Sequence, residues 1–324
     1  TKEDLKELVQ KAHDRGMKVV MDAVFNHTGK EFFAFKDILE KGEKSKYLDW
    51  YYIDELPLKG EWGEIPNFLC FGYYGGMPKL NLKNPEVANY ITDVACYWIR
   101  ECDIDGWRLD VGDEISHFFW KNFRKAIKAV KKDMLIIGEI WHYAGDFLEG
   151  DEWDTVMNYP FYLNLIDLLA DEKITVSQFI QNLGYLKGRL NKKCYPLMWN
   201  LIDSHDTARF LHLCDDNKKK QHLAAAFQLL LPGMPMIYYG DEFAMPGAND
   251  PDCRRGMYWD EEYQDKEMFE WYKQLLKVRK NHACIVEGEP MELAARDEEE
   301  TIVLTRKNGE ETLALIFNCS SSAR

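Results

Sequence analysis

Asp110, Glu139 and Asp206 each end a short apolar segment of the kind that forms buried parallel strands. Carboxylates at the carboxyl ends of parallel strands are typical of α/β barrels, where these strand ends carry the active site. Because burying even one carboxylate is costly, three of them in separate strands are better explained by chemistry than by the core. We therefore interpret the three residues as one active site. The segments are Ile104–Asp110, Met134–Glu139 and Leu197–Asp206.

A pair of carboxylates is the minimum for hydrolysis of a glycosidic bond, in which one attacks the sugar or activates water and the other protonates the leaving oxygen. Asp110 and Glu139 lie one βα unit apart, so we expect them on adjacent strands about 4.8 Å apart. That spacing favours a retaining over an inverting mechanism. Arg108 shares the strand face of Asp110 and should lower its pKa. Partial burial should raise the pKa of Glu139, as a general acid requires.

Several other polar residues at the ends of apolar segments have a structural as well as a chemical explanation. Asp22, Asp203 and Asp241 could each be a turn or cap residue. His27 and His205 could be core histidines, although their polar neighbours favour hydrogen bonds to a substrate. A metal-dependent hydrolase would need a cluster of histidines at the strand ends, and these two are too few.

The composition excludes some classes of partner. With a net charge of −14 and a pI near 5.1, the chain would repel a phosphate backbone, so we expect no nucleic acid partner. It contains no apolar run long enough to span a membrane, and we expect no membrane partner. Its eight cysteines lack the spacing of a zinc site. We interpret them as reduced thiols and expect a cytoplasmic location.

Predicted helices and strands alternate along the chain. A capping box at Thr1 begins a helix that Gly16 ends, and Met17–Phe25 follows as a strand. Six segments qualify as parallel strands, whereas a closed barrel needs eight. We expect the first two barrel strands to be absent from this sequence. Further helices are predicted at 85–101, 116–131, 161–170, 176–190, 219–231 and 266–281, and further strands at 104–109, 134–138, 155–158, 196–202 and 234–239.

The fold class that follows is α/β: a (β/α)8 TIM barrel that is incomplete at its N-terminus, with two additions. The barrel covers residues 1–28 and 85–284. Residues 29–84 exceed the length of a barrel loop and are rich in aromatic residues, so we expect an inserted subdomain that shapes the substrate site. Residues 285–324 show the alternation of antiparallel strands around an Asn308-Gly309 turn and predict a truncated C-terminal β domain.

Five ordered motifs resemble those of the α-amylase family of glycoside hydrolases. Three further features are similar to the cyclomaltodextrinase, neopullulanase and maltogenic amylase branch of that family: the Met77–Asn81 motif, Glu139–His142 and Val156–Pro160. The resemblance covers nearly the whole chain. The five motifs are Asp22–His27, Met77–Asn81, Gly106–Asp110, Gly138–Trp141 and Ser204–Thr207.

The resemblance implies a role for each matching residue. Asp110 would be the nucleophile that forms a covalent glycosyl-enzyme, and Glu139 the general acid and then the general base. Asp206 would bind sugar hydroxyls and stabilise the oxocarbenium-like state. The implied substrate-binding residues are His27, Arg108, Glu114, Trp141, His205, Asp250 and Arg254, of which Asp250 and Arg254 match donor-side sugar contacts in relatives.

Two departures from the family pattern bear on cofactor and specificity. Many amylases bind calcium through a histidine four residues after the nucleophile, and here that position is Glu114, as in the cyclomaltodextrinase branch. We therefore expect no required cofactor, with calcium left open. Gly112-Asp113 replaces the Ala-Asn that is common in the branch, which leaves the acceptor-side preference open. The branch dimerises through an amino-terminal domain that this sequence lacks, so a homodimer of the full-length protein is also left open.

The activity that the resemblance implies is retaining hydrolysis of α-1,4-glucosidic bonds in cyclodextrins, maltooligosaccharides, starch or pullulan, with some transglycosylation. Two alternatives remain. One is a transglycosylase or isomerase of the same family, since the acceptor site that decides this is poorly defined by sequence. The other is a non-catalytic interaction module like the transporter subunits in this family. Those subunits typically lose catalytic carboxylates, whereas this chain keeps all three.

Overall fold

The structure is a computed structural model that describes residues 1–60 and 63–320. It contains two compact units, which are described separately below. The first comprises residues 1–140 and 146–156, and the second comprises residues 141–145 and the described chain from Met157 onward. The predicted domains divide the chain at other positions and stay a prediction.

A parallel sheet in the order β1-β2-β3-β4 forms the centre of the first unit. Its central strands are almost continuously apolar and buried, as expected where both faces of a parallel sheet are covered. The predicted strands are confirmed, although each is shorter than predicted. They are β1 (Val20–Val24), β2 (Gly106–Asp110), β3 (Leu135–Gly138) and β4 (Thr155–Val156).

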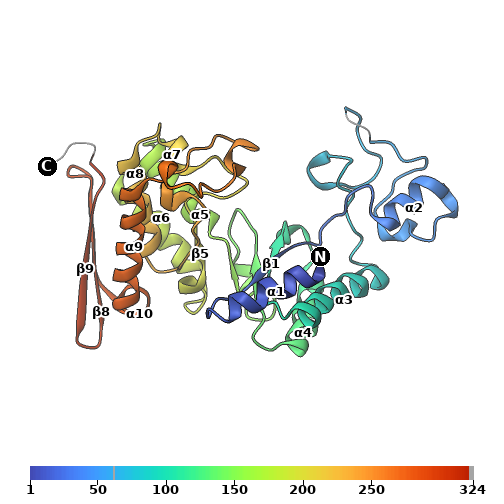
Figure 1. The fold of residues 1–324 in the computed structure, drawn as a ribbon, viewed down its shortest axis with the longest axis horizontal. Helices are drawn as coiled ribbons and strands as arrows, with labels where there is room; N and C mark the ends of the chain where they lie inside the picture. The colour runs from blue at the N-terminus through green and yellow to red at the C-terminus, as the bar shows by residue number, and fades with distance from the viewer. Residues whose placement is uncertain (61–62, 321–324) are drawn as a thin grey trace. The chain divides into compact units, whose positions relative to one another are not determined.

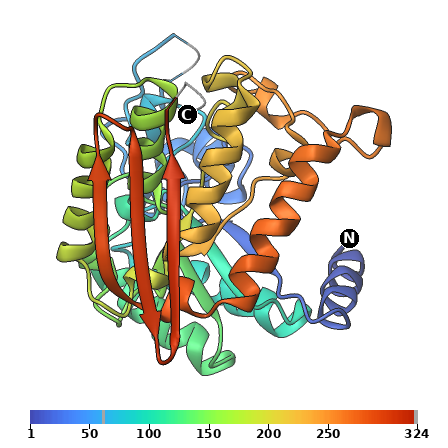
Figure 2. The ribbon, with the colours of Figure 1, turned by 90° about the vertical axis from the view of Figure 1, so that its left-hand side faces the viewer.

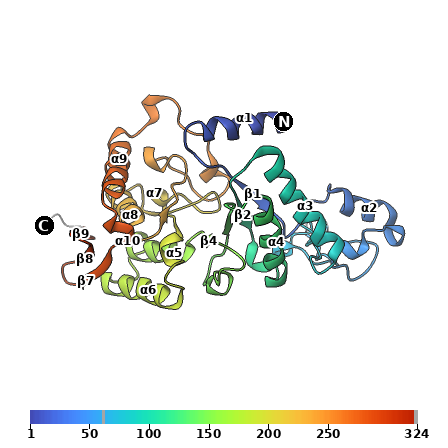
Figure 3. The ribbon, with the colours of Figure 1, turned by 90° about the horizontal axis from the view of Figure 1, so that it is seen from below.

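The helices of the first unit begin at side-chain caps that the sequence makes recognisable. Thr1 and Asp4 form the predicted capping box, and Asn84 caps α3 directly before Pro85. The helices α3 and α4 lie side by side (Figure 3). The buried face of α4 includes Phe119 and Phe123. The bounds are α1 (Lys2–His13), α2 (Phe33–Lys41), α3 (Pro85–Cys102) and α4 (His117–Val130).

The segment between β1 and α3 has an aromatic core of its own. Phe35 of α2 packs edge-on against Tyr51, with ring centroids 5.0 Å apart, and against Phe68 at 5.1 Å. A β-bridge pairs His27 with Lys79 and so ties this segment to the chain just after β1. This position at the carboxyl end of a strand is where we predict a substrate-shaping insertion.

The second unit contains a two-stranded parallel sheet of β5 (Trp199–Asn200) and β6 (Met234–Pro235). The predicted strands at 196–202 and 234–239 are therefore wrong in length. Residues Tyr195–Leu197 form a 3₁₀ turn that contains Pro196, which ends any strand on that side. Pro235 has no N–H group to donate to the ladder, so β6 cannot continue as a regular strand.

The helices of the second unit follow the predictions with one correction. The helix predicted at 161–170 begins at Tyr159, after the Asn158 cap, and changes at Ile166–Ala170 into a π-helical turn. The bounds of the helices are α5 (Tyr159–Leu165), α6 (Val176–Arg189), α7 (Phe210–Leu213), α8 (Lys218–Leu230), α9 (Lys266–Asn281) and α10 (Cys284–Glu287) (Figure 1).

An antiparallel sheet follows α10, as predicted for the C-terminal region. It runs in the order β7-β8-β9 and faces the viewer in Figure 2. The rings of Phe317 and Phe227 of α8 stack 4.3 Å apart, which packs the buried face of the sheet on the helices. The predicted turn is confirmed, with Gly309 at φ 60°. The strands are β7 (Glu289–Arg296), β8 (Thr301–Asn308) and β9 (Glu311–Asn318).

The six predicted parallel strands are thus present in the described residues, four in one sheet and two in another. Within the described chain, β1 pairs only with β2 and forms an edge of its sheet. A closed barrel is not formed by these pairings. In the same described residues, the helices are all too short or too polar to cross a membrane.

We predict that Gly138→Ala destabilises the first unit. A Cβ atom at position 138 would lie 2.2 Å from the Trp153 ring, which is itself buried. Such overpacking costs about 1–3 kcal/mol in chemical denaturation. The matched control is Gly184→Ala in α6, where a Cβ atom meets nothing within 4 Å, and there we expect a gain of about 0.5–1 kcal/mol. An unchanged stability of Gly138→Ala would contradict the packing.

Candidate active site

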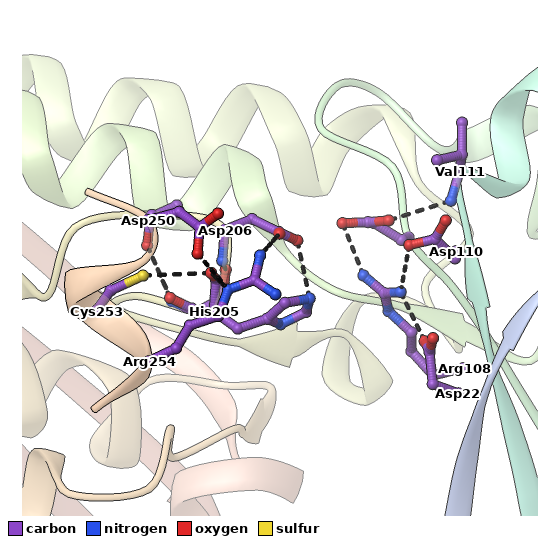
Figure 4. A network of polar contacts seen from close by, with 12 residues as sticks. Asp22, Arg108, Asp110, Val111, His205, Asp206, Asp250, Cys253 and Arg254 are labelled. Carbon is purple, nitrogen blue, oxygen red and sulfur yellow. Dashed lines mark hydrogen bonds and ion pairs between the residues drawn. The ribbon is translucent and has the colours of Figure 1, made fainter. Parts of the chain in front are cut away.

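The Arg108 guanidinium is the centre of a cluster of carboxylates in the first unit (Figure 4). Its Nη1 atom lies 2.6 Å from Asp22 Oδ1 and 2.8 Å from Asp110 Oδ1. Its Nη2 atom lies 2.8 Å from Glu139 Oε1. One cation therefore contacts three carboxylates.

The parallel register brings these groups together. Asp22 of β1 is the direct partner of Arg108 of β2, so their side chains leave the sheet side by side. Asp110 lies two residues beyond Arg108 and points to the same face. Glu139 directly follows β3, and its backbone N–H donates to the Leu109 carbonyl at 3.0 Å. The prediction that Asp110 and Glu139 come from adjacent strands is confirmed.

The carboxyl groups of the cluster differ in exposure. Glu139 is only 5% exposed as a residue, whereas the side chain of Asp110 is 21% and that of Asp22 55% exposed. The Val111 N–H donates to Glu139 Oε2 at 3.1 Å. To do so, Val111 adopts φ 47°, a conformation that β-branched residues rarely take and that is typical of functional sites.

The electrostatics of the cluster stabilise the charge of Arg108. Burial alone would lower the pKa of Arg108, but the charges of Glu139 and Asp22 and the hydrogen bonds with Asp110 and Asp22 raise it well above the usual value. The arginine is therefore a permanent cation beside the three carboxylates. The predicted lowering of the Asp110 pKa and raising of the Glu139 pKa stay predictions.

His27 lies beside the same cluster. Its imidazole stacks on Phe71, with ring centroids 5.2 Å apart and planes 8° from parallel. Burial lowers the pKa of His27, and the positive charge of Lys79 adds to this, whereas Asp110 and Glu114 act in the opposite direction. At neutral pH His27 is therefore neutral and has a ring nitrogen with which to bind a hydroxyl group.

Lys79 holds the position at which family members with calcium would need oxygen ligands. Its ammonium group donates to the Glu114 carbonyl at 3.1 Å, to Glu114 Oε2 at 3.2 Å and to Asn26 Oδ1. A lysine cation among these oxygens does not leave them free for a divalent cation. In the described chain no group of three or more His, Cys, Asp or Glu residues is arranged to hold a metal. These residues therefore do not fit a calcium site.

A second polar group lies in the second unit, in the loop between β5 and α7 (Figure 4). His205 Nε2 lies 3.1 Å from Asp206 Oδ2. Arg254 contacts Asp206 Oδ1 at 3.2 Å through Nη2, and Asp250 Oδ1 at 2.7 Å through Nε. The four residues that we predicted from this part of the chain are thus in mutual contact.

Hydrogen bonds fix the backbone of this loop. The Asp206 N–H donates to Ser204 Oγ at 3.1 Å, and the Ser204 N–H donates to Thr207 Oγ1 at 2.9 Å. The His205 carbonyl accepts from Arg254 Nε at 3.0 Å and from the Cys253 thiol at 3.3 Å. The carboxylate of Asp206 is therefore presented by a short, internally bonded turn.

Trp141 offers an exposed aromatic face in the same unit. It is 40% exposed and stacks on the buried Tyr159 ring, with centroids 3.9 Å apart and planes 13° from parallel. It also borders a pocket of about 370 Å³ whose other walls include Tyr143, Leu163 and Tyr185. A flat aromatic ring supported from behind is suited to the apolar face of a sugar.

Comparison with known proteins agrees with this arrangement. The model of the α-amylase catalytic domain matches residues 1–288. The chain belongs to the α-amylase family. It is 47% identical over 322 residues to a cyclomaltodextrinase of Geobacillus thermopakistaniensis, covering 99% of this chain and 54% of that protein. It is 46% identical over 282 residues to neopullulanase 2 of Thermoactinomyces vulgaris, covering 87% of this chain and 48% of that protein.

Solved structures give the same result for the fold. A cyclomaltodextrinase with 42% identity superposes with a TM-score of 0.94, covering 97% of this chain and 54% of that one. A cyclic α-maltosyl-(1→6)-maltose hydrolase from Arthrobacter globiformis, 34% identical, gives 0.92 and covers 98% and 71%. The chain spans about half the length of the curated relatives it matches. The predicted resemblance to the cyclomaltodextrinase and neopullulanase branch is confirmed.

The predicted site residues fall into two groups. Residues 27, 108, 110, 114 and 139 gather in the first unit, and residues 141, 205, 206, 250 and 254 belong to the second. Sequence reasoning treated Asp22 as an ambiguous turn residue and gave Lys79 no role. The register of β1 with β2 makes Asp22 a partner of Arg108. Lys79 lies inside the quoted Met77–Asn81 motif, which was the available signal.

We predict that Lys79→Met lowers thermal stability without creating sensitivity to chelators. The change removes the donor to the buried Asn26 Oδ1 atom, and an unsatisfied buried group costs about 1–3 kcal/mol. The control is Lys83→Met at an exposed position of the same segment, which should leave the melting temperature unchanged. A loss of stability of the unmodified protein in EDTA would contradict the role given to Lys79.

Proposed function

We propose that the protein is a retaining glycoside hydrolase that cleaves α-1,4-glucosidic bonds. The observation that carries this proposal is the pairing of one guanidinium with two carboxyl groups, Asp110 and Glu139, from adjacent parallel strands. Retaining enzymes use two carboxyl groups about 5–5.5 Å apart, and neighbouring strands favour that spacing. Membership of the α-amylase family supports the same chemistry.

In the proposed mechanism Asp110 attacks the anomeric carbon while Glu139 gives its proton to the leaving oxygen. The resulting glycosyl-Asp110 ester is then cleaved by water, whose proton returns to Glu139. Arg108 keeps Asp110 ionised for the attack. Arg108 contacts both carboxyl groups, so it is the deeper burial of Glu139 that favours its role as the proton donor.

We propose that Asp206 belongs to the same active site and binds sugar hydroxyls, which strengthens as positive charge develops on the ring. The order of the motifs along the chain supports this assignment. His205 and Arg254 would hold Asp206 in place, with Asp250 reaching the donor-side sugar. On the other side of the scissile bond, Trp141 would stack on an acceptor sugar. His27 and Glu114 would complete the set of substrate contacts.

The proposed substrates are α-glucans and cyclodextrins. Relatives carry the names cyclomaltodextrinase, neopullulanase and maltogenic α-amylase, and one solved relative is described in complex with maltose. Transfer to a sugar acceptor is the second candidate, because the exposed Trp141 ring could hold an acceptor in place of water. A non-catalytic role is disfavoured by the retention of Asp110, Glu139 and Asp206.

We propose that the catalytic domain is a (β/α)8 barrel built from residues 1–28 and 85–284, whose first two strands lie outside this sequence. The edge of β1 is where those strands would pair. Val24 at that edge is 44% exposed, which is unusual for a strand of a parallel sheet. Residues 29–84 would form the inserted subdomain and residues 285–324 part of a C-terminal β domain.

Three further properties are proposed for the whole protein. A homodimer is proposed from the resemblance to the cyclomaltodextrinase branch. A cytoplasmic location is proposed because a relative with 41% identity is named intracellular maltogenic amylase. Activity without a required cofactor is proposed because Lys79 already contacts the oxygens of Asn26 and Glu114.

We predict that Asp110→Ala lowers kcat at least about a thousandfold, because the glycosyl-enzyme ester cannot form. Substrate binding, measured by calorimetry with β-cyclodextrin, should remain largely intact. Asp133→Ala, at an exposed turn before β3, is the control and should retain activity. Substantial turnover by Asp110→Ala would show that another residue is the nucleophile.

We predict that Glu139→Gln slows the cleavage of natural glucans far more than that of nitrophenyl glycosides. A nitrophenolate leaves without a proton, whereas a sugar oxygen needs one. The kcat/KM ratio of variant to wild type, measured on both substrates, checks this difference. Equal losses on the two substrates would count against Glu139 as the acid.

Product analysis tests the proposed function as a whole. The full-length protein is incubated with β-cyclodextrin and with soluble starch, and the anomeric configuration of the first products is followed by NMR. Ring opening with α-anomeric products would support a retaining cyclodextrin hydrolase. First products of the β-configuration, or cleavage of neither substrate, would overturn the proposal.

A further inference from the structure

A group of titratable side chains lies fully buried behind the loop that carries Asp206. Asp203, Arg209 and Asp241 are each at most 1% exposed, and Tyr272 is 2% exposed. They come from separate elements: the loop after β5, the start of α7, the turn after β6 and helix α9. We name these four residues the buried polar cluster.

Each carboxyl group of the cluster has one satisfied and one unsatisfied oxygen. Asp203 Oδ2 accepts from the Phe210 N–H at 2.7 Å, and Asp241 Oδ1 accepts from Arg209 Nη1 at 3.2 Å. Asp203 Oδ1 and Asp241 Oδ2 are buried and receive no hydrogen bond from the described residues. The two carboxyl groups are nevertheless within hydrogen-bonding reach of each other.

Two ionised carboxylates in this position would be strongly unfavourable. The cluster holds one cation, Arg209, so full ionisation would leave a buried net negative charge, which costs several kcal/mol or more. Two carboxylate oxygens in contact also repel each other unless a proton lies between them. One added proton removes the repulsion, satisfies both orphan oxygens and makes the cluster neutral.

We propose that Asp203 and Asp241 share one proton at neutral pH and, with Arg209, form a neutral clamp that positions the loop carrying His205 and Asp206. Asp203 and Arg209 bracket this loop in the chain. The Arg209 N–H also donates to the Gly247 carbonyl at 3.0 Å, and its guanidinium lies 4.4 Å from the Tyr238 ring centroid. Asp203, Arg209 and Asp241 are thus positioning residues that do not touch the substrate.

The surroundings of the pair favour the shared proton. Gln221 of α8 uses its amide N–H groups for the Asp241 carbonyl rather than for a carboxylate oxygen. Besides Arg209, the titratable groups that act on the pair are Glu242 and Tyr272. Glu242 is acidic and Tyr272 is a neutral phenol whose pKa burial raises further, so Arg209 is the only cation among these groups.

The pH dependence follows from the same charges. Burial raises the pKa of Asp203 to about 6, and burial with the charge of Asp203 raises that of Asp241 well above its usual value. The unfolded chain releases these protons near pH 4. From about pH 4 up to the folded pKa, the native protein binds more protons than the unfolded chain, so stability falls as the pH rises.

The test compares the unfolding equilibrium of wild type and Asp203→Asn between pH 4 and pH 8. Asparagine keeps the acceptor for the Phe210 N–H and supplies a permanent donor to Asp241. In wild type, the proton shared by the pair should raise the unfolding constant by up to about tenfold per pH unit in the titrating window. We expect Asp203→Asn to remain folded and to lack this rise.

Asp215→Asn is the matched control, because Asp215 is exposed and its φ of 52° is one that asparagine tolerates. Its pH profile should coincide with that of wild type. If Asp203→Asn lowers stability equally at every pH, both carboxylates are ionised and the proposal is overturned. Should the variant fail to fold, infrared spectra of wild type labelled with ¹³C-aspartate decide. A carboxylic-acid carbonyl band at neutral pH supports the shared proton, and its absence overturns it.

The positioning role rests on the proposed glycosidase function and has its own readout. Asp203→Ala should lower kcat on cyclodextrin with a smaller change in KM, and Asp203→Asn should restore most of kcat. If the alanine variant keeps the wild-type kcat, the clamp does not position Asp206. If wild type cleaves no glucan, the proposed function and this positioning role both fail, but the stability and infrared results still decide the shared proton.

Discussion

The contact of Arg108 with three carboxylates is the interaction on which the candidate site of the first unit depends. A buried guanidinium without partners would be costly, and so would buried carboxylates without a cation. Each is tolerable because strands β1, β2 and β3 end side by side and deliver the charges to one point. The parallel register is thus a requirement of the electrostatics as well as of the fold.

Lysine and arginine serve as fixed cations throughout the two units. Arg108 balances the carboxylates at the strand ends, Lys79 ties the inserted segment to Asn26 and Glu114, and Arg209 lies among buried acids behind the loop of Asp206. A protein cation of this kind is present from the moment of folding and needs no metal supply. The chain, with its net negative charge, uses such cations where carboxylates concentrate.

The sequence predicts the elements that obey simple periodic or capping rules and fails where longer-range contacts decide. The helices from Thr1 and Pro85 and the adjacency of Asp110 and Glu139 follow from caps and spacing. The lengths of β5 and β6 do not, because apolar residues continue beyond the last paired residue. Likewise, nothing local distinguishes Asp203 and Asp241 from turn residues, since their meeting depends on the packing of separate elements.

The measurement that tests the account most directly is the identification of the residue that becomes covalently glycosylated. The full-length protein is treated with a fluorinated maltosyl fluoride, digested and examined by mass spectrometry. We predict a glycosyl adduct on the peptide that contains Asp110 and on that residue. An adduct on a different residue, or turnover of glucans with inversion and without any adduct, would contradict the assignment of Asp110 and Glu139.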